Sequence, residues 1–129
     1  MSREILFRGY SSRFKKWIEG DLIILGGTLY QIRRREDEVT FVVDPSTVCQ
    51  YTGLTDKNGV KIWENDICTV DGEDGLFLVE WDEDTARFVL DGDGITIDFD
   101  NAYGSDCEVW GNTFDNPELL ENGGTGEDD

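Results

Sequence analysis

Short apolar runs separated by turn sequences are the feature that most constrains how this chain folds. Runs such as 22–25, 39–43 and 67–70 are rich in Val, Ile and Leu. They recur at intervals of roughly ten residues, which is typical of a barrel or a sandwich. The turn at 56–59 contains Asn-Gly, a strong hairpin signal because both residues tolerate positive φ. The pattern predicts a mainly β fold.

The expected strands fall into two consecutive groups. The first, residues 1–47, opens with an expected hairpin whose turn lies at 9–13. The second, residues 48–120, has a step between strands at 64–66 followed by a long hairpin, and by analogy this order indicates an SH3-like β-barrel. We therefore expect N-terminal strands joined to an SH3-like barrel, with the two parts either sharing one core or forming separate cores.

The C-terminal region carries the only clear helix signal. Asn116 precedes Pro117, and a capping residue followed by proline at the first helical position predicts a short helical turn. Residues 121–129 contain Gly, Asn, Thr and acids but no apolar residue. We expect this segment to be a disordered acidic tail.

Charge is distributed very unevenly along the chain. Its 129 residues include 11 Lys or Arg and 29 Asp or Glu, for a net charge of −18. Residues 1–35 hold eight cationic and three acidic side chains, whereas residues 36–129 hold three and 26. So negative a field repels nucleic acid phosphates and favours cationic partners.

Acidic residues in and near the expected turns after residue 70 form a candidate acidic interaction face. Turn formation and solvated charge explain most of them, but such a face also suits a protein that imitates DNA phosphates and occupies a basic site on a host protein. The candidate residues are Glu73, Asp74, Asp82, Glu83, Asp84, Asp91 and Asp93.

Cationic residues in the first third of the chain form a candidate basic interaction face. They are Lys15, Lys16, Arg33, Arg34 and Arg35. Together with nearby aromatic side chains they suit phosphate contact and base stacking. The other interpretation, which the net charge favours, is that these cations balance acids within the chain or across a subunit contact.

Catalytic and metal-binding signals are absent from the sequence. The chain has no histidine, which excludes Ser-His and Cys-His nucleophile arrangements, and it lacks both common phosphate-binding glycine motifs. The acidic stretch from Asp91 departs from the EF-hand calcium loop because Thr96 stands where that loop requires glycine. We expect no catalysis, no cofactor and no bound metal.

The cysteine and tryptophan residues have structural interpretations. Cys49, Cys68 and Cys107 are widely spaced without a C-x-x-C pair, so we expect small buried hydrophobes in a reducing compartment. Trp63, Trp81 and Trp110 occur in strand-like contexts, and we expect all three in the core. No apolar run approaches the roughly 20 residues that span a bilayer, and no signal peptide pattern opens the chain, so we expect a cytoplasmic protein.

Three segments of the sequence resemble the YopX family of phage and prophage proteins. They are SREILFRGY, VDPSTVCQYTGLTDKNGVKIWENDICTV and VWGNTFDNPELL. The chain departs from the family pattern in having Cys49 and Asn65 where glycine is usual and Trp110 where isoleucine is usual. The resemblance implies a small β-rich protein of temperate phages and related mobile elements, and it assigns no catalytic residue.

These observations together predict a non-enzymatic phage or prophage accessory protein in the host cytoplasm that acts by binding another protein. One version is an acidic DNA mimic. Because positive and negative charge are separated along the chain, we also expect self-association into a homo-oligomer. The alternative function is nucleic acid binding through the basic N-terminal segment.

Overall fold

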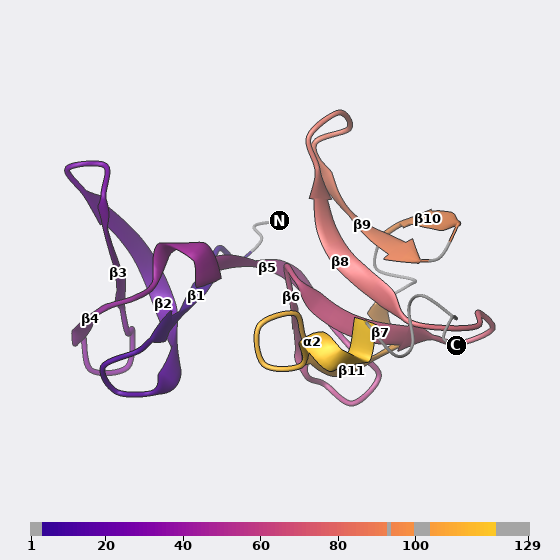
Figure 1. Ribbon diagram of the computed structural model, residues 1–129, viewed down its shortest axis with the longest axis horizontal. Coiled ribbons are helices and arrows are strands. Elements are labelled where there is room, and N and C mark those ends of the chain that lie inside the picture. Colours follow the sequence, from indigo (N-terminus) through magenta and orange to yellow (C-terminus); the bar gives the residue numbers. More distant parts are fainter. Residues whose placement is uncertain (1–3, 93, 100–103, 121–129) are drawn as a thin grey trace. The chain divides into compact units, whose positions relative to one another are not determined.

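The computed structural model describes residues 4–92, 94–99 and 104–120 and is mainly β, as the sequence predicts (Figure 1). The chain divides into two compact units, residues 1–51 and 52–129. The division lies inside the strand Cys49–Thr55. In the sheet order this strand has β1 as its neighbour on one side and β6 on the other.

The first unit is an antiparallel sheet in the order β4-β3-β2-β1-β5. Its elements are β1 (Phe7–Ser11), β2 (Lys16–Leu25), β3 (Leu29–Arg33), β4 (Thr40–Val42), the 3-10 turn η1 (Pro45–Thr47) and the start of β5 (Cys49–Thr55). The hairpin of β2 and β3 turns at Gly26 and Gly27, both at positive φ. Buried Ile18, Ile32 and Phe41 form its core with Val43.

The expected turn at 9–13 is wrong because Gly9 belongs to β1 and the turn follows Ser11. A Cβ atom on Gly9 would lie 2.8 Å from Cγ2 of Val43. Glycine stands there because the Val43 side chain packs directly against it, and not because the chain reverses. The reversal falls at Lys15, whose φ is 57°.

The second unit contains an antiparallel sheet in the order β10-β9-β8-β7-β11. Its elements are the end of β5, β6 (Lys61–Trp63), β7 (Asp66–Val70), β8 (Phe77–Asp82), β9 (Arg87–Gly92), β10 (Ile95–Asp98), β11 (Cys107–Asn112) and the helical turn α2 (Pro117–Leu119). Its core side chains are fully or almost fully buried. They are Ile62, Cys68, Val70, Phe77, Val79, Phe88, Leu90 and Cys107.

The prediction that the cysteines are buried is confirmed, and the tryptophan prediction is only partly right. All three cysteines are buried free thiols, and Trp63 is buried. Trp81 and Trp110, however, are 43% and 57% exposed. Trp81 lies near the end of β8, and the register of β11 shifts between Val109 and Gly111, so Trp110 lies in an irregular part of its strand. Such a bulge redirects a side chain, and the sequence gives no sign of it.

The predicted helical turn after Asn116 is confirmed as α2. The Asn116 side chain does not cap it; its Oδ1 accepts the N–H of Asn112 instead. The expected disordered tail at 121–129 lies outside the described residues. Among the residues that are described, no helix is long and apolar enough to cross a membrane.

Candidate interaction surfaces

The most distinctive segment of the sequence, around 52–67, is held together by a buried carboxylate. Asp56 is 5% exposed and accepts the N–H groups of Asn58, Val60 and Val109 at 2.8, 2.9 and 2.9 Å. Burial by itself would raise the pKa of Asp56, but these backbone donors outweigh it and the pKa lies below the usual value. Asp56 therefore fixes the hairpin turn and ties it to β11.

Other polar residues of this segment also bond to the backbone. The hydroxyl of Thr52 donates to the carbonyl of Ile62 at 2.8 Å, and the carboxylate of buried Asp66 accepts the N–H of Trp63 at 2.8 Å. Asn65 has a φ of 73°, a left-handed conformation that glycine adopts freely and asparagine tolerates. The polar side chains of this segment therefore hold the local fold together.

The predicted acidic face is distributed over two turns of the second unit. Glu73 and Asp74 lie exposed between β7 and β8, and Asp82, Glu83 and Asp84 lie where β8 turns into β9. Figure 1 shows these turns at opposite ends of β8. A six-residue strand rises about 20 Å at 3.3 Å per residue, which is roughly the separation of the two groups.

The remaining acidic candidates lie near the start of β8 or outside the description. Asp91 is opposite Leu78 in the register of β8 and β9 and accepts the Thr96 hydroxyl at 3.4 Å. Asp93 is not among the described residues. Within the described part of the chain, none of the predicted acidic-face residues forms an ion pair with Lys or Arg.

Glu80 belongs with these acids, although it is not one of the predicted acidic-face residues. Burial raises the pKa of Glu80, and the hydrogen bond with Asp91 and the negative charge of that residue raise it further. The signal that identifies it is the register: Glu80 pairs with Val89 and Leu78 with Asp91, so these residues share one face of the sheet. A chain with many acids gives no reason to select this one before strand pairing is known.

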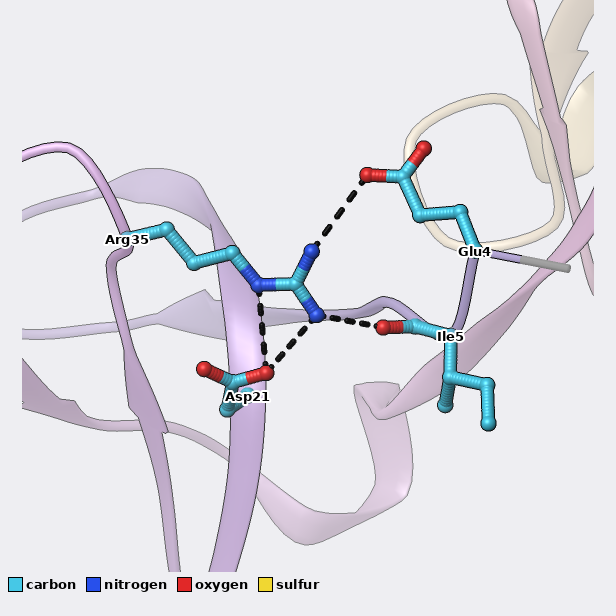
Figure 2. Close-up of polar contacts among 4 residues, drawn as sticks. All are labelled: Glu4, Ile5, Asp21 and Arg35. Carbon is cyan, nitrogen blue, oxygen red and sulfur yellow. Dashed lines mark hydrogen bonds and ion pairs between the residues drawn. The ribbon is translucent and has the colours of Figure 1, made fainter. Parts of the chain in front are cut away.

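Arg35, a predicted basic-face residue, is bound to acids of its own unit (Figure 2). Its Nε and Nη2 donate to Oδ1 of Asp21 at 3.1 and 2.8 Å, its Nη1 lies 3.3 Å from Glu4 Oε2, and Nη2 also donates to the Ile5 carbonyl. The hydrogen bond from Arg35 lowers the pKa of Asp21 despite the opposing effect of burial.

Arg33 and Arg34 are paired in the same way. Arg34 makes a bidentate contact with Asp37, with N–O distances of 3.0 and 2.7 Å, and Arg33 lies 2.8 Å from Glu38. The hydrogen bond from Arg34 lowers the pKa of Asp37 to about 2, against the opposing effect of burial. Lys15 and Lys16 are exposed, and neither contacts an acid among the described residues.

Charge is consequently balanced within the first unit and not within the second. Residues 1–51 carry eight Lys or Arg and seven Asp or Glu, whereas residues 52–129 carry three and 22. In the second unit Lys57 pairs with Asp71 and Arg87 pairs with Asp98. No group of three or more potential metal ligands occurs among the described residues.

The first unit also contains a groove that the sequence analysis did not predict. Its volume is about 710 Å³, and it lies between the turn after β1 and the segment that runs from β4 to η1. The lining residues are Ser11, Ser12, Arg13, Phe14, Thr40, Phe41, Val42, Val43, Asp44 and Pro45. The one indication in the sequence is Phe14, a large apolar residue inside a cationic turn.

The described residues define a small antiparallel β protein whose most distinctive sequence segment has a structural role. A family model described as YopX protein matches residues 6–121, which is most of the chain. The chain belongs to the YopX protein family, as the three resembling segments indicate. No curated protein matches it.

Proposed function

We propose that this protein is a non-catalytic accessory protein of a phage or prophage that acts by binding another protein through its acidic second unit. The observation that carries the proposal is the charge imbalance of residues 52–129, which hold 22 acids against three cations. Because Lys57 and Arg87 are already paired with acids, the exposed turns at the ends of β8 keep an uncompensated negative field. Such a field attracts a cationic protein surface.

DNA mimicry is the sharper form of this proposal. A DNA strand presents one phosphate for every ~3.4 Å along the helix axis. The acidic groups at the two ends of β8, about 20 Å apart by strand rise, would span roughly six such intervals. The binding partner is then a nucleic-acid-binding protein with an extended basic cleft.

A binding assay with matched charge variants tests the proposal. The full chain is immobilised, proteins of the host lysate are captured, and the same capture is repeated with Glu83→Gln/Asp84→Asn. The control is Glu19→Gln/Glu36→Gln, which removes two exposed acids from the first unit. We expect the first variant to lose the partner and the control to retain it. Equal retention by both variants would contradict the proposal.

Competition with duplex DNA separates mimicry from other protein binding. If the acidic turns occupy a DNA-binding cleft, an excess of duplex DNA releases the captured partner. If DNA has no effect while Glu83→Gln/Asp84→Asn abolishes capture, the protein binds a cationic surface that is not a DNA site. Catalysis and a cofactor form no part of the proposal.

Nucleic acid binding through the first unit is the second candidate, and Lys15 and Lys16 favour it because neither contacts an acid among the described residues. The neighbouring Arg33, Arg34 and Arg35 would have to exchange their present carboxylate partners for phosphates. A gel mobility shift at low salt, with Lys15→Ala/Lys16→Ala beside the triple Arg→Ala variant, measures this. Absence of a shift at low salt would eliminate the candidate.

Three further properties accompany the proposed function. We place residues 48–120 in an SH3-like arrangement, which rests on the order of β6, the step at 64–66, β7 and the hairpin of β8 and β9. We also propose a homo-oligomer in the host cytoplasm, in which cations of one copy face acids of another. Sedimentation at low and high salt checks the second property, since screening should dissociate such an assembly.

A further inference from the structure

The groove in the first unit combines apolar walls with an open strand edge. Phe14 and Val42 line it and are 55% and 56% exposed, and the ring of Phe41 meets that of Phe14 edge to face with centroids 5.5 Å apart. Exposed aromatic and branched side chains around a concave surface are characteristic of sites that bury a partner side chain.

β4 supplies the open edge because it ends the order β4-β3-β2-β1-β5. The N–H of Arg34 donates to the carbonyl of Val39, and the N–H of Val43 donates to the carbonyl of Tyr30. Backbone groups alternate in direction along an antiparallel strand, so those of Thr40 and Val42 point away from β3. Both residues line the groove, and such groups are a template for one more strand.

Cations surround the apolar part of the groove. The Arg13 guanidinium lies 5.5 Å from the Phe14 ring, and the Lys16 ammonium lies 5.4 Å from the Phe41 ring. Neither cation contacts an acid among the described residues. The one acid of the lining, Asp44, already accepts the N–H and the hydroxyl of Ser46. The groove is therefore complementary to carboxylates beside an apolar side chain.

We propose that this groove binds an extended acidic peptide segment of a partner protein by addition to the edge of β4. The peptide backbone pairs with Thr40 and Val42, a large apolar side chain packs on the exposed ring of Phe14, and flanking carboxylates meet Arg13 and Lys16. Recognition by strand addition takes affinity from backbone hydrogen bonds and specificity from such side-chain contacts. This site is separate from the proposed acidic surface and takes a ligand of opposite charge.

A peptide is favoured over the two other possible occupants. Nucleic acid phosphates would use the cations but leave the apolar walls and the open strand edge without a role. A second copy of this chain presents many of its exposed acids in turns, such as those at 71–75 and 83–86, and a turn cannot pair along the edge of β4 as an extended segment does. An extended acidic segment follows the strand edge.

Titration with a synthetic peptide tests the site. The probe alternates glutamate and valine around a central phenylalanine, and one control replaces every glutamate with lysine. The full chain is labelled with ¹⁵N, and we expect the amide signals of Thr40 and Val42 to shift with the acidic peptide. We expect the lysine peptide to bind at least about tenfold more weakly, a difference of ~1.4 kcal/mol.

Variants of the protein distinguish this site from nonspecific binding. Phe14→Ala removes an exposed wall of the groove, and Ile24→Ala is the control because Ile24 is a comparably exposed apolar residue, at 44%, outside the lining. A bound peptide would bury the exposed part of the Phe14 ring, so Phe14→Ala should weaken binding by about tenfold or more. Ile24→Ala should bind as the unaltered chain does.

Each contrary result overturns the proposal. No shift at millimolar acidic peptide excludes the site, and equal binding of the lysine peptide excludes charge recognition. Tighter binding of a single-stranded DNA oligonucleotide at the same amides assigns the groove to nucleic acid. Self-association without peptide that Phe14→Ala abolishes assigns the groove to a second copy. Amide signal shifts confined to the second unit would show that the peptide binds there and not at β4.

Discussion

The two units of this protein handle charge in opposite ways. In the first unit Arg33, Arg34 and Arg35 pair with acids of the same unit, and cations and acids almost cancel. In the second unit acids outnumber cations 22 to three. A segment rich in Arg is therefore not necessarily an electrostatic binding surface. An excess of acids that nearby cations cannot neutralise must face solvent or a binding partner.

The units also differ in where their sequence specificity lies. The distinctive segment around 52–67 opens the second unit, and its polar side chains bond to backbone groups there. The open groove lies in the first unit, and of its lining residues only Val43, Asp44 and Pro45 belong to one of the three family segments. The residues around 52–67 therefore maintain the fold of the second unit, whereas most of the groove is built from residues outside the family segments.

The largest expected effect comes from removing the carboxylate that organises the second unit. Asp56→Ala leaves three backbone N–H groups without an acceptor, and we expect a loss of about 3 kcal/mol in the free energy of unfolding. Denaturant unfolding followed by tryptophan fluorescence measures it. Asp44→Ala is the control in the first unit, where an exposed carboxylate caps η1 and the expected loss is about 1 kcal/mol. Equal losses of unfolding free energy in the two variants would show that the buried carboxylate of Asp56 stabilises the protein no more than an exposed one does.

A smaller effect is expected at the left-handed residue of the step between β6 and β7. Asn65→Ala places a Cβ-bearing residue without a compensating side chain at a φ of 73°, which should cost about 1 kcal/mol. Asn65→Gly restores the residue usual in the family and should cost less. The same unfolding assay compares them. A glycine variant less stable than the alanine variant would mean that side-chain contacts of Asn65 outweigh its backbone conformation.

Glu80 provides a pH test within the acidic unit. Its pKa is raised by burial and by Asp91, so its contribution to stability is fully present below the pKa of the unfolded chain and is lost as pH rises through the folded pKa. Glu80→Gln should therefore be more stable than the unaltered chain at pH 7, with a difference that shrinks on acidification to pH 4. Thermal unfolding across this range measures the trend. A difference independent of pH would contradict it.

The smallest effect is expected for Arg35, the central cation of the balanced unit. Arg35→Gln removes contacts with Asp21 and Glu4 that are exposed and screened by salt, so it should destabilise less than Asn65→Ala. The lowered pKa of Asp21 also predicts how the effect depends on pH. The stabilising contribution of Asp21 is present above its pKa in the unfolded chain and is lost as pH falls through its pKa in the folded chain. Melting at low and high salt should show the effect of the substitution only at low salt.

The strands could be predicted from sequence because apolar alternation and turn residues act locally. The apolar run at 22–25, which ends β2, and the turn before Val60 are examples. Trp110 could not be predicted, because its exposure accompanies a register shift between β11 and β7. The role of Gly9 could not be predicted for a similar reason, since glycine is required there by contact with Val43, a residue distant in sequence.

The candidate surfaces were less predictable than the strands. The sequence identified the acids, but strand order separated Glu73 and Asp74 from the group at Asp82 by the length of β8. It identified the arginines too, but not that Arg35 meets Asp21 and Glu4, 14 and 31 residues away. The groove at Phe14 depends on the turn after β1 packing beside β4, which no local pattern indicates.

The sequence by itself determined the family, the mainly β class, the burial of the cysteines and the net charge. These properties follow from composition, short-range alternation and a motif whose residues bond mostly to near neighbours. Only the tertiary structure decided which charges are neutralised, which tryptophans face solvent and where an apolar groove meets an open strand edge. These depend on strand order and register, which bring together residues that the chain keeps far apart.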